Sequence, residues 1–127
     1  MTPQEIQFER LKLCQYNDMD GKKVAALLEK EKKRWKAFML CRVDYHELIE
    51  LRDMASGILN TDTLFILTEE KHIDFLTTAF KKLSADEIGY INSKNEAYGV
   101  ASDPDKFWQV FGGGLESGQV VMRIWWD

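Results

Sequence analysis

Cysteines, prolines and long apolar runs are scarce in this sequence of 127 residues. Its two cysteines, Cys14 and Cys41, make neither the framework of a disulfide-stapled secreted domain nor the paired ligands of a zinc knuckle. No apolar stretch approaches the roughly 20 residues that span a bilayer, and the first residues lack the basic and apolar regions of a signal peptide. These absences predict a cytoplasmic protein without a membrane partner.

The composition is that of a folded domain. Hydrophobic residues make up 45% of the chain and aromatic residues 12%, with only two prolines, so the signature of a disordered chain is absent. A chain of this length buries a core without disulfide or metal staples. No repeat, low-complexity tract or linker divides it. We therefore expect one domain over residues 1–127, and no cofactor.

The charges are unevenly distributed along the chain. The formal net charge is −4, yet residues 1–43 carry ten Lys or Arg against six Asp or Glu, whereas residues 44–127 carry seven against fifteen. An acidic surface suits a basic protein partner. It disfavours a general nucleic-acid binder, which needs concentrated positive charge. Association with a second copy of the chain stays open.

One basic cluster runs against this trend and surrounds a tryptophan. Its members are Lys30, Lys32, Lys33, Arg34 and Lys36, with Trp35 among them. Such a cluster offers phosphate contacts and one stacking platform to single-stranded nucleic acid. Because Glu29 and Glu31 interrupt it, the favoured interpretation is the solvent face of an amphipathic helix.

The first third of the chain has two helix-start signals. Thr2, Pro3 and Glu5 have the spacing of a capping box and predict a short helix, although partial two-residue alternation further on leaves a strand open. Asp18 or Asp20 caps a second helix that runs to about Arg34. We therefore expect a helical region over about residues 1–34 that packs on a sheet.

The remaining residues alternate between strand and helix patterns. Apolar or β-branched runs predict strands at 35–43, 63–68, 88–91, 97–101 and 120–126, and helical spacing predicts helices at 45–59, 69–83 and 102–111. This order predicts a single α/β (or α+β) domain with a mixed sheet of about five strands, flanked by about four to five helices. We expect 35–43 to be central, the first crossover to be parallel, and 88–101 to form a hairpin.

Three polar residues share one face of the helix predicted at 45–59. His46, Glu50 and Asp53 are four and three residues apart, within about 60° of arc at 100° per residue. Imidazole and carboxylate groups together suit an acid/base pair or a divalent metal. No repeated ligand motif supports a metal, so we predict no metal site, and a solvated helix face is the favoured interpretation.

Two features near the end of the chain also bear on function. The glycine-rich segment 112–118 follows a predicted helix, whereas phosphate-binding loops precede one, so we interpret it as a turn. Trp125 and Trp126 are neighbours on a strand and point to opposite faces. An exposed tryptophan there, beside Tyr90 or Trp108 and the acidic Asp127, resembles an interface hot spot.

These observations favour a small protein-binding module, of the inhibitor, immunity or adaptor type, rather than an enzyme. Its binding surface is acidic and contains aromatic residues; the candidates are Tyr90, Trp108, Trp125, Trp126 and Asp127. The alternative is a small enzyme or ligand-binding domain with a pocket at strand ends. His46, Glu50 and Asp53 would carry its chemistry, with Tyr90 or Tyr98 as a polar wall.

Overall fold

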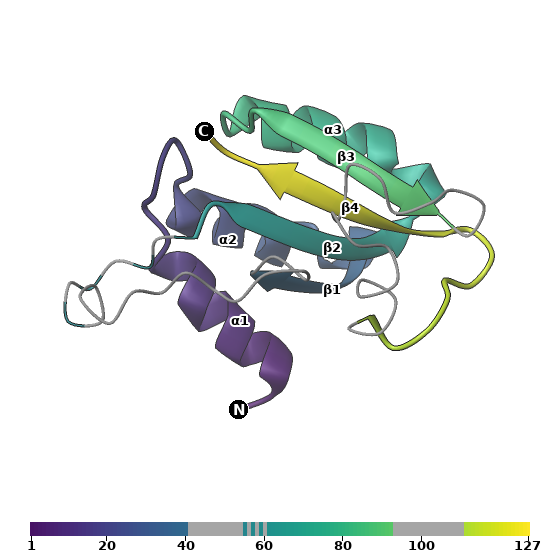
Figure 1. The fold of residues 1–127 in the computed structure, drawn as a ribbon, viewed down its shortest axis with the longest axis horizontal. Coiled ribbons are helices and arrows are strands. Elements are labelled where there is room, and N and C mark those ends of the chain that lie inside the picture. Colours follow the sequence, from purple (N-terminus) through teal and green to yellow (C-terminus); the bar gives the residue numbers. More distant parts are fainter. Residues whose placement is uncertain (41–54, 56, 58, 60, 93–110) are drawn as a thin grey trace.

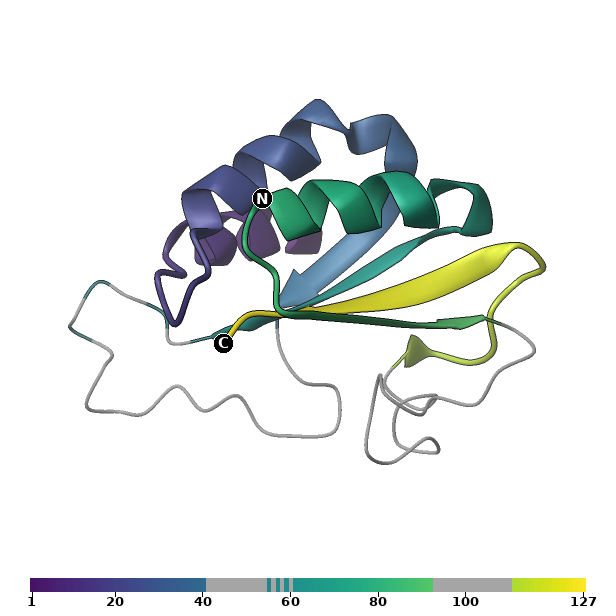
Figure 2. The same cartoon turned by 90° about the horizontal axis from the view of Figure 1, so that it is seen from above.

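A sheet with helices on one side organises the protein. The computed structural model describes residues 1–40, 55, 57, 59, 61–92 and 111–127. The helices are α1 (Pro3–Lys12), α2 (Gly21–Lys30) and α3 (Ile73–Lys82), with short 3-10 turns η1 (Lys32–Arg34) and η3 (Glu70–His72). The strands are β1 (Trp35–Leu40), β2 (Thr63–Glu69), β3 (Glu87–Asn92) and β4 (Gln119–Trp125). All three helices lie on the same face of the sheet (Figure 2).

The sheet of the described residues has the order β1-β2-β4-β3, and each neighbouring pair is antiparallel (Figure 1). The α/β class is confirmed. The expected mixed sheet and parallel first crossover are not found, because every strand pair is antiparallel. The described ranges hold four strands and three α-helices rather than the expected five strands and four to five helices. An apolar run fits a parallel or an antiparallel neighbour equally well, so it does not determine strand direction. The expected elements at 45–59, 97–101 and 102–111 fall mainly or wholly outside the described residues.

Strand β1 is at an edge of this sheet, so the central position expected for 35–43 is wrong. Three of its outer backbone groups are nevertheless paired. The side chain of Gln4 accepts from the N–H of Phe38 at 2.9 Å and donates to its carbonyl at 3.0 Å, and Gln7 accepts from the N–H of Leu40 at 2.8 Å. Helix α1 thus covers the edge, which otherwise is a template for pairing with another chain.

Helix α1 begins with the predicted capping box, so a strand at these residues is ruled out. The Thr2 side chain accepts from the N–H of Glu5 at 3.1 Å, and the Glu5 carboxylate accepts from the N–H of Thr2 at 3.4 Å. Phe8 and Leu11 on this helix are buried.

Helix α2 begins at a capped position but ends earlier than expected. The Asp20 carboxylate accepts from the N–H of Lys23 at 3.3 Å and from the Gln15 side chain at 3.2 Å. The hydrogen bond from Gln15 holds the pKa of Asp20 below its ordinary value of 3.8. The helix stops at Lys30, and the turn η1 replaces the last residues of the helix predicted to Arg34.

The main core lies between the helices and the sheet. Phe8, Leu28, Phe80 and Trp126 are buried there together with the inward residues of the strands. A smaller cluster of Phe65, Ile91 and Val121 is buried on the opposite face, with Phe111 and Leu115 packed against it. Within the described ranges, none of the helices combines the length and the apolar character needed to cross a bilayer.

Candidate functional site

Five of the candidate site residues named from the sequence lie outside the described part of the chain. They are His46, Glu50, Asp53, Tyr98 and Trp108. The acid/base or metal stripe therefore stays a prediction. Among the described residues, no group of three or more His, Cys, Asp or Glu side chains is arranged to hold a metal ion.

The other predicted binding residues occupy three different environments. Trp126 is fully buried, its indole N–H donates to the Leu83 carbonyl at 2.9 Å, and its ring meets Phe80 edge-on. Trp126 therefore belongs to the core. Trp125 is half-buried, and because side chains alternate along a strand it points to the face opposite Ile124. Tyr90 is 48% exposed on β3, and Asp127 is also exposed.

Backbone hydrogen bonds gather acidic residues at one end of the sheet. The N–H of Asp18 donates to the carbonyl of Asp127 at 2.9 Å, and the N–H of Trp126 donates to the carbonyl of Asp62 at 3.0 Å. The N–H of Asp86 donates to the carbonyl of Trp125 at 2.8 Å. We call this region the acidic end, defined by Asp18, Asp62, Asp86 and Asp127.

The turn between α1 and α2 completes the acidic end and holds an exposed aromatic. Asn17 adopts a left-handed backbone with φ of 54°, which asparagine tolerates better than most residues. Its side-chain amide donates to the Asp62 carboxylate at 2.9 Å and to the Trp126 carbonyl at 3.4 Å. The same turn carries Tyr16, which is 44% exposed beside Asp18.

The negative charge of the acidic end is largely uncompensated. In the described part of the chain, Asp18, Asp86 and Asp127 are exposed and their carboxylates have no ion-pair partner. Lys81 reaches this end, where its ammonium donates to the backbone carbonyl of Asp86 at 3.0 Å. Four carboxylates with one lysine among them give this end a negative electrostatic field.

The opposite end of the sheet contains a pocket of about 390 Å³. We call it the basic pocket; its walls are Lys33, Arg34, Trp35, Lys36, Thr68, Glu69, His72, Glu116, Ser117 and Gln119. Glu69 pairs with Gln119 across β2 and β4, and Thr63 pairs with Trp125 at the other end of the same strands. Six residues of strand therefore separate the pocket from the acidic end, about 20 Å.

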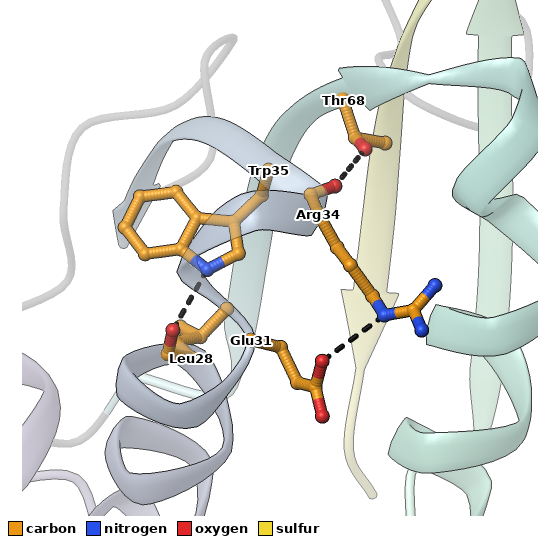
Figure 3. Close-up of polar contacts among 5 residues, drawn as sticks. All are labelled: Leu28, Glu31, Arg34, Trp35 and Thr68. Atoms are coloured by element: carbon orange, nitrogen blue, oxygen red, sulfur yellow. Dashed lines mark hydrogen bonds and ion pairs between the residues drawn. The ribbon is translucent and has the colours of Figure 1, made fainter.

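Hydrogen bonds hold the walls of the basic pocket together. The Thr68 hydroxyl donates to the Arg34 carbonyl (Figure 3), and the N–H of Glu70 donates to the carbonyl of Gly118 at 2.9 Å. The N–H of Glu116 donates to the side-chain oxygen of Gln119 at 3.0 Å. Segments 33–36, 68–72 and 116–119 therefore meet although they are distant in sequence.

Arg34 and Trp35 are already engaged by the protein. The Arg34 guanidinium pairs with Glu31 at 3.0 Å and lies 3.6 Å from the centre of the Phe75 ring. The Trp35 indole N–H donates to the carbonyl of Leu28 in α2 at 2.9 Å, and Figure 3 shows the indole ring turned toward this helix. The Trp35 ring also packs on Phe8 and Phe38, so it is not a free platform for stacking a nucleobase.

Cys14 is not a reactive thiol. It is fully buried, and burial raises its pKa from 9.0 to about 12. The thiolate needed for nucleophilic attack is therefore scarce at neutral pH. Cys14 is instead part of the main hydrophobic core.

The sequence contains the parts of both ends but does not show that they come together. The lysine cluster was interpreted as a solvated helix face, and segment 112–118 as a turn, because neither pattern reveals that the two segments meet. Tyr16 was not singled out, although Asn17 and Asp18 next to it are typical turn residues.

Comparison with protein-family models, curated proteins and solved structures found no match for this chain. Function is therefore inferred from the geometry of the two ends of the sheet.

Proposed function

We propose that the protein is a small binding module that recognises a basic protein through its acidic end. The observation that supports this function is the gathering of Asp18, Asp62, Asp86 and Asp127 around one end of the sheet, beside the exposed Tyr16. Exposed carboxylates steer a positive partner toward the surface, and a tyrosine with one polar tip is a common interface anchor.

The acidic end is held in place before any partner arrives. Asn17 joins the turn at 15–20 to Asp62 and to the Trp126 carbonyl, and backbone bonds fix Asp18 and Asp86 against the end of β4. A preorganised surface loses less conformational entropy on binding. Recognition in the cytoplasm, as an inhibitor, immunity or adaptor protein, is part of this proposal.

Affinity capture from the source organism tests the proposal through charge variants. The acidic-end variant carries Asp18→Asn, Asp86→Asn and Asp127→Asn. The control variant carries Glu9→Gln, Glu29→Gln and Asp74→Asn, which remove the same charge at exposed positions elsewhere. A basic protein that the wild type and the control retain, that the acidic-end variant loses, and whose retention falls with added salt is the expected result.

Loss of the same protein from both variants would mean that only net charge matters and would refute a specific acidic end. Retention that no carboxylate variant changes would refute the proposal as well.

Two tyrosines of similar exposure test which aromatic anchors the partner. Tyr16 is 44% exposed at the acidic end, and Tyr90 is 48% exposed on β3. We expect Tyr16→Ala to weaken the captured complex by at least about tenfold, as hot-spot truncations do. Tyr90→Ala should have a smaller effect, because Tyr90 pairs with Met122, three residues along β4 from Trp125. The reverse order would move the anchor to β3.

A ligand-binding function, the alternative expected from the sequence, is favoured by a separate observation, the basic pocket at the strand ends. Chemistry at His46, Glu50 and Asp53 stays a prediction, because those residues lie outside the described part of the chain.

A further inference from the structure

The basic pocket combines cationic groups, neutral hydrogen-bond donors and one free carboxylate. We propose that it binds a small phosphorylated compound that also carries hydroxyl groups. This site is independent of the acidic end, because the two lie at opposite ends of β2 and β4 (Figure 1). Its volume of about 390 Å³ is within the range of small-ligand pockets, about 300–1,000 Å³.

Two lysines of the basic pocket are available to an anion. Arg34 and Glu69 are already ion-paired within the protein. Lys33 and Lys36 are exposed, and among the described residues neither has an ion-pair or hydrogen-bond partner. Hydrogen bonds between an ammonium group and a phosphoryl oxygen are charge-assisted and therefore stronger than neutral ones. The lysines are the groups that hold the phosphoryl end of the ligand.

The local backbone at Lys36 differs from the regular ladder of β1. The pairing register with β2 shifts between Trp35 and Ala37, so Lys36 is the extra residue of a bulge. A bulge leaves one residue outside the regular pairing and re-aims its side chain, and such irregularities occur often beside functional sites. Here the bulge coincides with the wall of the pocket.

Neutral donors line the same space. The Gln119 side-chain oxygen accepts from the N–H of Glu116, which leaves its amide nitrogen to donate to a ligand. Ser117 contributes an exposed hydroxyl. The Nδ1 atom of His72 is shielded from solvent and has no hydrogen-bond partner in the described ranges.

The carboxylate of Glu116 narrows the class of ligand. It is exposed at the pocket wall and has no partner among the described residues. A carboxylate accepts hydrogen bonds from hydroxyl groups and repels a second anion. It therefore favours a compound whose phosphoryl group meets the lysines and whose hydroxyl groups meet Glu116. Because Trp35 is engaged in the core, stacking of a nucleobase contributes nothing to this recognition.

Titration of isotope-labelled protein with glycerol phosphate, and separately with inorganic phosphate, tests the site by amide chemical shifts at low ionic strength. Glycerol phosphate should give saturable shifts at residues 33–36, 68–72 and 116–119. Lys36→Ala and Lys33→Ala should each weaken its binding by about tenfold, the effect of losing one charge-assisted hydrogen bond. Lys82→Ala, at the far end of α3, should leave the affinity unchanged.

Glu116→Gln separates the two ligands. Inorganic phosphate should bind about threefold more tightly to this variant, because a nearby like charge is removed. The preference for glycerol phosphate over inorganic phosphate should fall, because an acceptor for its hydroxyl groups is weakened.

Three outcomes would overturn the proposal. The first is the absence of saturable shifts at millimolar glycerol phosphate. The second is an equal loss of affinity in Lys82→Ala and Lys36→Ala, which would reveal nonspecific attraction to lysines. The third is an oligouridine that binds at the same residues far more tightly than glycerol phosphate and is not displaced by it, which would assign the surface to nucleic acid.

Discussion

We expect the replacement of Gly21 by alanine to destabilise the protein, the opposite of the effect that helix propensity predicts. Gly21 is the first residue of α2, and alanine is favoured over glycine inside a helix by about 1 kcal/mol. At this position, however, a Cβ atom would lie 1.8 Å from the Leu11 carbonyl oxygen and 2.6 Å from the Cys14 carbonyl oxygen. Cβ atoms essentially never approach a heavy atom closer than 3.0 Å, and both neighbours are backbone, so the corner between α1 and α2 must open.

The expected free-energy change follows from these contacts. The backbone shifts needed to accommodate the extra Cβ atom cost about 1–3 kcal/mol. Movement of α2 also lengthens the bond from the Gly21 N–H to the Cys14 carbonyl, which is 2.7 Å long, at a further cost of about 1 kcal/mol. Since the gain in helix propensity offsets only part of this, we expect Gly21→Ala to lower the free energy of unfolding by about 2 kcal/mol.

Urea unfolding followed by far-UV circular dichroism measures this change, and an unchanged m-value shows that the comparison is valid. Gly114→Ala is the matched control, because a Cβ atom there meets nothing within 4 Å and the backbone is not left-handed. We expect the control to change stability by less than about 1 kcal/mol. If Gly21→Ala is as stable as Gly114→Ala, the close approach of α2 to the end of α1 is refuted.

Three further changes test the core, the buried thiol and the covered edge. Phe80→Ala should lower the free energy of unfolding by about 3–5 kcal/mol because Phe80 is fully buried. Phe75 lies on the same helix but is 39% exposed, so Phe75→Ala should lower the free energy of unfolding by less than about 1 kcal/mol. Equal losses in the two variants would contradict the assigned helix face. The reactivity of Cys14 can be measured in a Cys41→Ser variant. Because the pKa of the Cys14 thiol is about 12, about 4 units above an assay pH of 8, the folded protein should resist a thiol reagent. The protein unfolded in urea should react fully. Fast reaction of the folded protein would mean that Cys14 is accessible. Gln7→Ala should lower the free energy of unfolding by about 1 kcal/mol, since the N–H of Leu40 loses its acceptor. Increased self-association of this variant in sedimentation would show that the β1 edge is uncovered. No change in either measurement would mean that water replaces Gln7 fully.

Local signals predicted elements better than they predicted neighbours. The capping box at Thr2 is present, and Asp20 rather than Asp18 is the N-cap of α2. Caps can be predicted because they depend on residues only a few positions apart. The strands at 35–40, 63–69, 87–92 and 119–125 agree with the apolar runs. The expected position of β1 in the sheet was wrong, because this edge strand is covered on both faces: Phe38 and Leu40 are buried in the main core, and Met39 packs against the smaller cluster on the other face.

The candidate binding regions followed the same division. The sequence contained the lysine cluster, the glycine-rich segment and the excess of acidic residues. It did not show that Lys36, His72 and Glu116 line one pocket, since their proximity depends on the antiparallel pairing of β2 with β1 and β4. The two adjacent tryptophans were also ambiguous, and burial against Phe80 assigned Trp126 to the core.

The sequence by itself determined the α/β class of the domain, the start of α1, the start of α2 to within two residues, and the four strand segments of the described residues. Those properties arise from side-chain periodicity and from hydrogen bonds between near neighbours. Only the tertiary structure decided the strand order, the covering of the β1 edge by Gln4 and Gln7, and the separation of charge into an acidic end and a basic pocket. Each of these depends on contacts between residues far apart in the chain, whose free energies are set by packing rather than by local preference.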